Sequence, residues 1–241
     1  MHEVWNGDDP LAEVEAYLRE AGFFGGRDRD VVADVFLAYG ISRSIRRAQW
    51  PDPPEPCRLP LAAVHVRPAA DQPSPGGDYA VGEWSSTWSA AEYAAAVASV
   101  RSAIERGDVY QVNLVQHLSA PFEGDAAGLA ERLAPLRPLH PTALAGDGWA
   151  IVSASPELFL ARRGRRAWTM PIKGTRPAGG GGELRESEKD AAEHLMIVDL
   201  ERNDLSRVCE PGSVRWPELM RERALAGVTH LVSTVEGRLR A

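Results

Sequence analysis

Cysteine is scarce in this chain, which excludes proteins held together by several disulfides and proteins built around a thiolate zinc site. Among the 241 residues only Cys57 and Cys209 are cysteines. Two thiols are too few for a disulfide framework or for a zinc site built from thiolates. We therefore expect both to be plain buried thiols in a reducing compartment.

Long apolar runs are also missing. No stretch approaches the roughly 20 apolar residues that a membrane-spanning helix needs. Residues 1–6 carry neither the basic nor the apolar part of a signal peptide. A cytoplasmic protein is the expected outcome.

An excess of positive charge is absent as well. The formal net charge is −7, which disfavours general binding to nucleic acid or to a membrane surface. A small anionic substrate stays compatible, because a local site can be positive on a negative protein. The chain also has no phosphate-binding Walker motif, no dinucleotide glycine fingerprint and no Gly-x-Ser-x-Gly turn.

The first half of the chain contains two helix signals and one alternating segment. Asp9 and Pro10 suit the cap and first position of a helix. Ser89 and Glu92 form a capping box before a run of apolar residues at helical spacing. Residues 109–118 alternate between apolar and polar side chains, which predicts a strand.

The second half resembles strands joined by tight turns. Strands are predicted at residues 150–154 and 158–162, with a hairpin tip at 163–165 and a returning strand at 167–172. Residues 187–205 predict a helix that is apolar nearly all round and therefore buried. Residues 228–235 predict a final strand.

Lys173 and Glu157 interrupt apolar surroundings. Lys173 ends an apolar strand and precedes Gly174, where backbone can approach a ligand closely. The alternative for Lys173 is a surface lysine in a turn. Glu157 is either an exposed loop carboxylate or a partly buried acid suited to proton donation.

Glu193 shares a helical face with Ile197 and Leu200. A carboxylate on an apolar face needs a partner. That partner is an arginine in a salt bridge or a hard cation such as magnesium, and the residues alone favour the salt bridge. His194 and His230 are more simply explained as satisfied core residues than as ligands.

Several motifs together resemble the chorismate-binding enzymes, in the order and spacing of that family. The matching segments lie between residues 89 and 241, at 107–114, 155–159, 171–177, 187–190, 193–204 and 230–237. The resemblance implies an α+β fold of two stacked, mostly antiparallel sheets with outer helices, and a substrate cleft between the sheets.

Two positions distinguish members of this family. Aminodeoxychorismate synthases resemble the chain in carrying the lysine of the Pro-Ile-Lys-Gly-Thr motif, Lys173, where anthranilate, isochorismate and salicylate synthases usually have alanine. Gln111 stands where isochorismate and salicylate synthases carry a lysine that activates water. The resemblance is therefore strongest to component I of aminodeoxychorismate synthase, with anthranilate synthase component I as the alternative.

The same resemblance implies a reaction. Chorismate would be aminated at C4 to 4-amino-4-deoxychorismate, in para-aminobenzoate and folate biosynthesis. Lys173 would be the nucleophile and Glu157 the proton donor, while Glu193 would bind Mg²⁺. The substrate would be lined by Gln111, Gly174, Thr175 and His230. A glutamine amidotransferase subunit would supply ammonia.

The resemblance also implies a division of the chain and a departure from the family. Residues 1–88 match weakly and are expected to form a short N-terminal region, and residues 89–241 the first part of the catalytic domain. Family members continue beyond the strand at 230–237 with further magnesium ligands, so the fold is expected to be incomplete at the C-terminus. The chain alone is then expected to be inactive, either as a piece of a catalytic component or as a non-catalytic remnant.

Overall fold

The chain divides into two compact units. The computed structural model describes residues 1–24, 30–44, 57–71, 75–110, 112–178, 184, 187–225 and 227–240. Unit 1 consists of Met1–Leu129 and Ala143–Ile151, and unit 2 of Ala130–Thr142 and Val152–Ala241. Each unit has a sheet and a hydrophobic core of its own.

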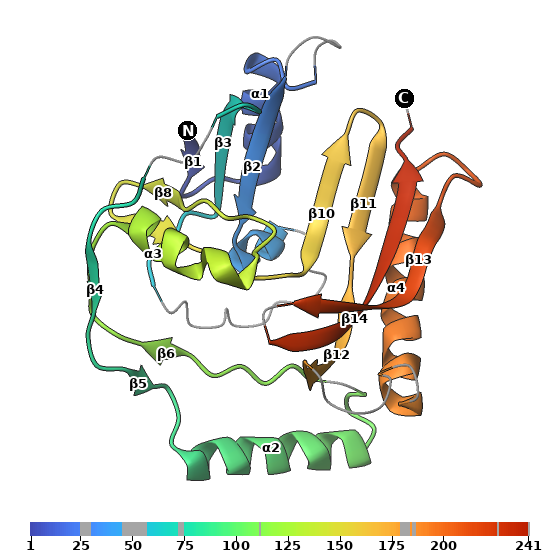
Figure 1. The fold of residues 1–241 in the computed structure, drawn as a ribbon. Coiled ribbons are helices and arrows are strands. Elements are labelled where there is room, and N and C mark those ends of the chain that lie inside the picture. Colours follow the sequence, from blue (N-terminus) through green and yellow to red (C-terminus); the bar gives the residue numbers. More distant parts are fainter. Residues whose placement is uncertain are drawn as a thin grey trace. The chain divides into compact units, whose positions relative to one another are not determined.

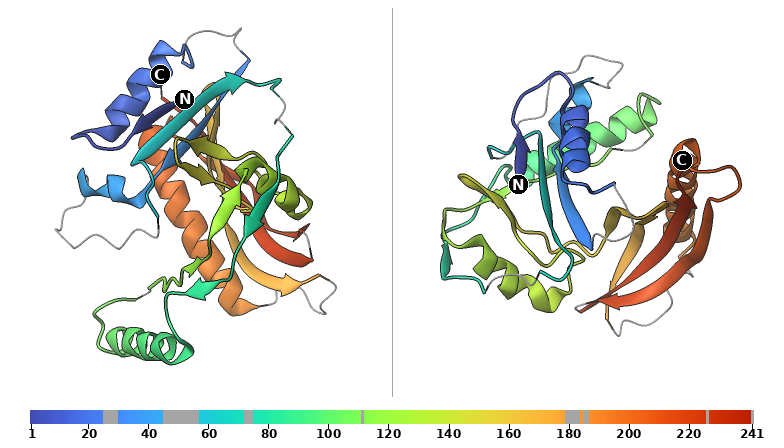
Figure 2. Two further views of the ribbon diagram at one scale, coloured as in Figure 1. Left: turned by 90° about the vertical axis from the view of Figure 1, so that its left-hand side faces the viewer. Right: turned by 90° about the horizontal axis from the view of Figure 1, so that it is seen from above.

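Unit 1 is built on a small antiparallel sheet with the strand order β1-β3-β2. Its strands are β1 (His2–Val4), β2 (Val31–Leu37) and β3 (Ala62–Pro68). Helix α1 (Pro10–Glu20) begins as predicted, because the side chain of Asp9 accepts the N–H of Ala12 at 3.0 Å. Val14 and Leu18 of this helix pack with the buried residues of β1 and β3 (Figure 2).

The other elements before unit 2's sheet are short or exposed. Helix α2 (Ala90–Glu105) has the predicted capping box between Ser89 and Glu92, but none of its residues is buried. The remaining short elements are η1 (Tyr39–Ser44), β4 (Tyr79–Val81), β5 (Ser85–Ser86), β6 (Leu118–Ser119), β7 (Phe122–Gly124), α3 (Ala126–Leu133), η2 (Ala134–Leu136), β8 (Leu144–Gly146) and β9 (Trp149–Ile151).

The predicted strand at residues 109–118 is largely wrong. Only its last residue belongs to a strand, β6, which pairs with β5. Residues 112–117 have no strand partner in the described part of the chain. Alternation predicts which side chains share a face, but a strand also needs a neighbour to pair with.

Unit 2 contains a five-stranded sheet in which every pair is antiparallel. Its strands are β10 (Leu158–Arg163), β11 (Arg166–Met170), β12 (Ile172–Pro177), β13 (Arg215–Leu225) and β14 (Val228–Arg238). Strand β14 is central. It pairs with β13 along one edge, while β11 and β12 share its other edge in succession (Figure 1).

The predicted hairpin in this sheet is confirmed, with one correction. The tip lies at Gly164 and Arg165, between β10 and β11. The returning strand does not run unbroken to Ile172 but ends at Met170, because Pro171 has no N–H to donate to a neighbouring strand. A second strand, β12, starts directly after it.

Helix α4 (Glu188–Val208) covers one face of this sheet. Val198, Leu205 and Cys209 pack there against Ala167 and Val235. The prediction of a helix buried all round is wrong, because only one stripe of it meets the sheet. Four of its apolar side chains are 46–58% exposed, namely Leu195, Met196, Leu200 and Val208.

The predicted fold class is confirmed, since the structure is a mixed α+β fold with mostly antiparallel sheets. The boundary at residue 88 stays a prediction. Cys209 is buried as expected, but Cys57 is exposed. In the part of the chain that the structure describes, no helix is long and apolar enough to cross a membrane.

Candidate functional site

Lys173 lies at an irregularity in strand β12. Lys173 pairs with Leu231 and Thr175 pairs with His230, so Gly174 is an extra residue that forms a β-bulge. Gly174 has a φ of +68°, and a Cβ atom there would lie 3.1 Å from Cδ2 of Leu184. Only glycine suits both the backbone and the space, and the bulge determines how the strand presents Lys173.

Glu157 is held close to Lys173 by the backbone. Its Oε1 atom accepts the N–H of Ile172, the residue before Lys173, at 2.9 Å. Of the two alternatives for this side chain, the structure agrees with the exposed loop carboxylate, since Glu157 is exposed at the end of the loop that precedes β10. Among the described residues, the hydrogen bond to β12 positions the acid.

His194 is a buried histidine in the same neighbourhood. Its Nε2 atom lies 2.6 Å from Oγ of Ser233 on β14, whereas its Nδ1 is buried without a partner among the described residues. Burial lowers the pKa of His194, the charge of Lys173 lowers it further, and the charge of Glu157 opposes them. The lowered pKa favours the neutral ring, and both Lys173 and Glu157 are near enough to influence it.

Gly174, Thr175 and His230 also come together. Nδ1 of His230 lies 3.0 Å from Oγ1 of Thr175 and 3.3 Å from the carbonyl oxygen of Gly174. These contacts join β12 to β14 beside the bulge. The predicted substrate-lining positions at residues 174, 175 and 230 are therefore neighbours, while Gln111 lies outside the described residues.

Glu201 was not among the residues singled out from the sequence. Burial raises its pKa to about 7; a hydrogen bond from Thr169 opposes that rise, and the charges of Glu157 and Asp204 add to it. Its Oε2 atom is buried without a partner among the described residues. Glu201 follows His194 by seven positions, so the two share the helical face that meets the sheet. This seven-residue spacing was the sequence signal that could have identified Glu201 as a buried residue.

Glu193 lies on a different face of α4 and is exposed. Among the described residues it has no ion pair, which disfavours the salt bridge that the residues alone suggested. The same residues contain no group of three side chains able to hold a metal. The binding of Mg²⁺ by Glu193 therefore stays a prediction, and the part of the chain that the structure describes adds no second ligand to it.

Comparison with known proteins decides the family. The family model described as chorismate binding enzyme matches residues 40–241. The chain belongs to the chorismate binding enzyme family. The match starts upstream of the motifs that carry the resemblance and covers the whole neighbourhood of Lys173.

The relatives within the chorismate binding enzymes divide between two activities. Anthranilate synthase component 1 of Streptomyces coelicolor is 38% identical over 211 residues, which are 83% of this chain and 39% of that protein. Aminodeoxychorismate synthase component 1 of Klebsiella aerogenes is 42% identical over 168 residues, which are 66% of this chain and 37% of that protein. The chain thus spans less than half the length of these curated relatives.

The fold agrees with that of a solved family member. The crystal structure of anthranilate synthase component I from Streptococcus pneumoniae matches with a TM-score of 0.69 and 21% sequence identity. The match covers 90% of this chain and 59% of that one. This likeness confirms the fold of the chorismate binding enzymes for the chain, and the choice of reaction rests on individual residues.

Proposed function

We propose that this chain carries the nucleophile and the acid of a chorismate-aminating enzyme, component I of aminodeoxychorismate synthase. The observation that supports the proposal is the hydrogen bond from the N–H of Ile172, the residue before Lys173, to Oε1 of Glu157. It holds a carboxyl group from a separate segment against the backbone of β12, and the charges of Lys173 and Glu157 both act on the pKa of the buried His194.

The two groups have complementary roles in this reaction. The neutral amine of Lys173 attacks C2 of chorismate, the ring double bonds shift, and the C4 hydroxyl leaves. Glu157 gives that hydroxyl its proton, so water departs. Ammonia then adds at C4 and expels the amine of Lys173. The product is 4-amino-4-deoxychorismate, and Glu157 regains a proton from the incoming ammonia.

The hydrogen bond of Glu157 suits this role. Because Oε1 accepts the N–H of Ile172, Oε2 would be the oxygen that gives the proton. The hydrogen bond fixes the carboxyl group against strand β12 one residue before the nucleophile. The bulge at Gly174 sets the direction of the strand directly after the amine.

Magnesium belongs to the proposal through Glu193. When bound, the ion would neutralise a carboxylate of chorismate and so favour its binding. Glu193 offers an exposed carboxylate without an ion pair among the described residues. Gly174, Thr175 and His230 would line the substrate, with Gln111 as a further contact.

Ammonia requires a second protein in this proposal. Neither Cys57 nor Cys209 lies in a Gly-x-Cys-x-Gly turn of the kind that activates a glutaminase thiol. The relatives from Streptomyces and Klebsiella are both named component 1. We infer that a glutamine amidotransferase is the partner, in a pathway to para-aminobenzoate.

Anthranilate synthesis is the second candidate. The Streptomyces coelicolor relative, named for that activity, aligns over more of the chain than the Klebsiella protein does. Lys173 disfavours this candidate. Its amine can form a covalent adduct with chorismate, whereas the alanine that anthranilate synthases usually carry at this position cannot. A covalent intermediate therefore separates the two reactions.

The test is the mass of the intact protein after incubation with chorismate and Mg²⁺ in the absence of ammonia. It uses the 241-residue chain and a version extended by the remaining part of a full-length relative. An increase equal to chorismate minus water, located on the peptide containing Lys173 and absent in Lys173→Ala, supports the proposal. Lys173→Arg should also lack the adduct, because a guanidinium stays protonated.

Three results would overturn this assignment. Full formation of aminodeoxychorismate by Lys173→Ala would leave the lysine without a catalytic role. Anthranilate as the main product of the unaltered extended version would select the second candidate. An extended version that binds no chorismate would instead favour the non-catalytic remnant.

A further inference from the structure

A second polar site lies at the other end of the unit 2 sheet from Lys173. Lys173 pairs with Leu231, whereas the second site surrounds Glu236 and Arg238, further along the same strand. Arg238 lies seven positions after Leu231 on β14, which is about 23 Å of extended chain. The two sites are therefore distinct.

The second site is a pocket of about 430 Å³. Three segments of unit 2 meet there: the tip of the β10–β11 hairpin, the turn between α4 and β13, and the end of β14. Its lining residues are Arg165, Arg166, Gly212, Ser213, Arg215, Glu236, Gly237 and Arg238. A pocket of this volume accommodates a small metabolite.

Strand register explains why the arginines gather there. Ala167 and Val235 face helix α4, so the alternate residues of β11 and β14 point to the opposite face. Arg166 pairs with Arg238, and Arg215 pairs with Glu236. Neighbouring strands thus bring their guanidinium groups to one end of one face.

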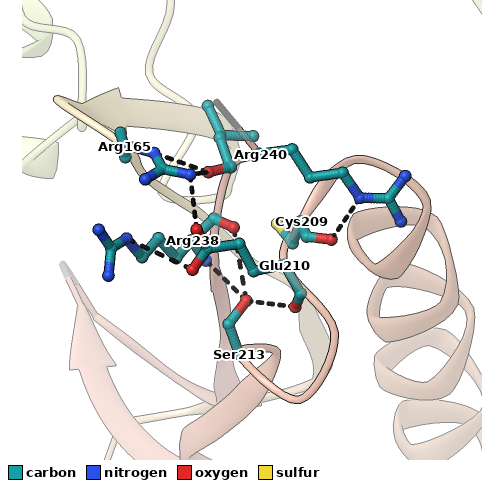
Figure 3. A network of polar contacts seen from close by, with 7 residues as sticks. Arg165, Cys209, Glu210, Ser213, Arg238 and Arg240 are labelled. Atoms are coloured by element: carbon teal, nitrogen blue, oxygen red, sulfur yellow. Dashed lines mark hydrogen bonds and ion pairs between the residues drawn. The ribbon is translucent and has the colours of Figure 1, made fainter.

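A network of polar contacts joins the segments that meet at this pocket (Figure 3). Arg165 donates to the carbonyl oxygen of Leu239 at 2.9 Å and to Oε1 of Glu210 at 2.7 Å. Ser213 Oγ donates to the carbonyl oxygen of Glu210 at 2.8 Å and accepts the N–H of Arg238 at 3.1 Å. The segments are therefore joined to one another before any ligand arrives.

The carboxylates of the site neutralise only part of its charge. Glu236 is 6% exposed and accepts from Nε of Arg166 and Nε of Arg215, each at 2.7 Å. Glu210 pairs with Arg165 and more loosely, at 3.5 Å, with Arg238. Four guanidinium groups face two carboxylates, so two positive charges are in surplus on a chain whose net charge is −7.

Donor groups are in surplus as well. A guanidinium carries five N–H donors, and the bonds to Glu236 engage Arg215 through its Nε. The side chains of Arg215 and Arg238 are 75% and 62% exposed. Their outer N–H groups are thus accessible at the rim of the pocket. The other two arginines, Arg165 and Arg166, are held by Glu210 and Glu236.

We infer that this pocket binds the oxyanion group of a small ligand, a phosphate or a pair of carboxylates, at a site separate from Lys173. Guanidinium forks match the planar geometry of such groups and bind them through paired hydrogen bonds. Glu236 orients two of the forks, and Arg215 and Arg238 supply donors to the ligand. This inference does not depend on the proposed reaction.

The experiment is calorimetric titration of the 241-residue chain with inorganic phosphate and, separately, with malonate. Chloride keeps the ionic strength constant, so that general screening does not change during the titration. Saturable binding of one probe identifies its class of oxyanion. Lys173→Ala should bind the same probe with unchanged affinity, which separates this site from the proposed catalytic one.

Two variants and one control locate the binding. Arg215→Gln combined with Arg238→Gln should weaken the affinity by about tenfold or more, because charge-assisted hydrogen bonds are lost. Arg207→Gln removes an exposed positive charge from the last turn of α4, outside the pocket, and should leave the affinity unchanged. If the double variant does not fold, Arg238→Gln alone serves, since the bond from its backbone N–H to Ser213 is retained.

Two outcomes would overturn the inference. One is the absence of saturable binding of both probes to a folded chain. The other is equal affinity in the parent and in the folded arginine variants, which would reveal an adventitious ion elsewhere on the surface.

Discussion

The Nε2 atom of His194 lies 2.6 Å from the Oγ atom of Ser233, and this contact joins helix α4 to the central strand β14. The same Oγ accepts the N–H of Met220 on β13 at 2.9 Å. One hydroxyl group therefore links three elements, α4, β13 and β14. Both His194 and Ser233 are fully buried, so water cannot replace these bonds.

Ser233→Ala should reduce the free energy of unfolding by about 1–3 kcal/mol, because the buried ring of His194 and the partly buried N–H of Met220 lose their partner. Urea denaturation measures the change. Ser206→Ala is the matched control, since its hydroxyl bonds to Asn203 on the exposed side of α4. Equal stability of the two variants would mean that His194 and Met220 find other partners.

Gly174→Ala should destabilise the chain more than Gly164→Ala does. Both glycines have a positive φ, +68° and +58°, so each substitution carries a backbone cost of about 1–2 kcal/mol. Only at Gly174 does the added Cβ approach another side chain, Leu184 at 3.1 Å. Urea denaturation of the two variants separates these contributions. If both lose the same stability, the close packing around the bulge is unimportant.

Glu201→Gln should change how stability depends on pH. Glu201 ionises near 4.5 in the unfolded chain and near 7 in the folded one, chiefly because it is buried. Between these values the folded state holds a proton that the unfolded state has released. The stability that this proton provides is complete below about pH 4.5 and is lost as the pH rises through 7.

The side-chain amide of the Glu201→Gln variant has no such proton to lose, so the unfolding free energy of this variant should fall less than that of the parent between about pH 5 and pH 8. Urea denaturation at several pH values across this range measures the difference. Glu188→Gln removes an exposed carboxylate from the same helix and should retain the parental slope. Parallel curves for the parent and Glu201→Gln would contradict the raised pKa.

Which parts of this structure were predictable depends on how local each feature is. The helix starts at Asp9 and Ser89 and the turn at Gly164 were predicted, because caps and turns depend on residues a few positions apart. Strand β13 was missed. Pro217 and several charged residues interrupt its apolar pattern, and its pairing with β14 contains two irregularities.

The candidate site likewise contains residues that the sequence identified and residues that it did not. Family motifs identified Lys173, Glu157, Gly174, Thr175 and His230, and the structure brings these residues to one region. Glu201 was missed because its burial depends on which stripe of α4 meets the sheet. The exposure of Glu193 could not be predicted for the same reason, since Leu200 on its helical face is apolar and yet 58% exposed.

Glu193→Gln should raise the magnesium concentration needed for half-maximal activity of the extended version by about tenfold or more, since an oxygen ligand loses its charge. Activity is measured as aminodeoxychorismate formed from chorismate and ammonium salts over a range of magnesium concentrations. Glu188→Gln, on another face of the same helix, should not change this requirement. An unaltered requirement in Glu193→Gln would remove this residue from the metal site.

Glu157→Gln and Glu157→Ala together separate the two tasks assigned to this side chain. Glutamine keeps an oxygen that can accept the N–H of Ile172 but has no acidic proton. Its turnover in the extended version should therefore fall by about 10²–10⁴-fold while the unfolding free energy stays near that of the parent. Alanine loses the hydrogen bond as well, so it should also be about 1 kcal/mol less stable. Steady-state rates with ammonium salts and urea denaturation of the same preparations measure both effects. Parental turnover in Glu157→Gln would show that the leaving hydroxyl receives its proton from another group, and Glu201, whose charge interacts with that of Glu157, would be the next carboxyl to replace.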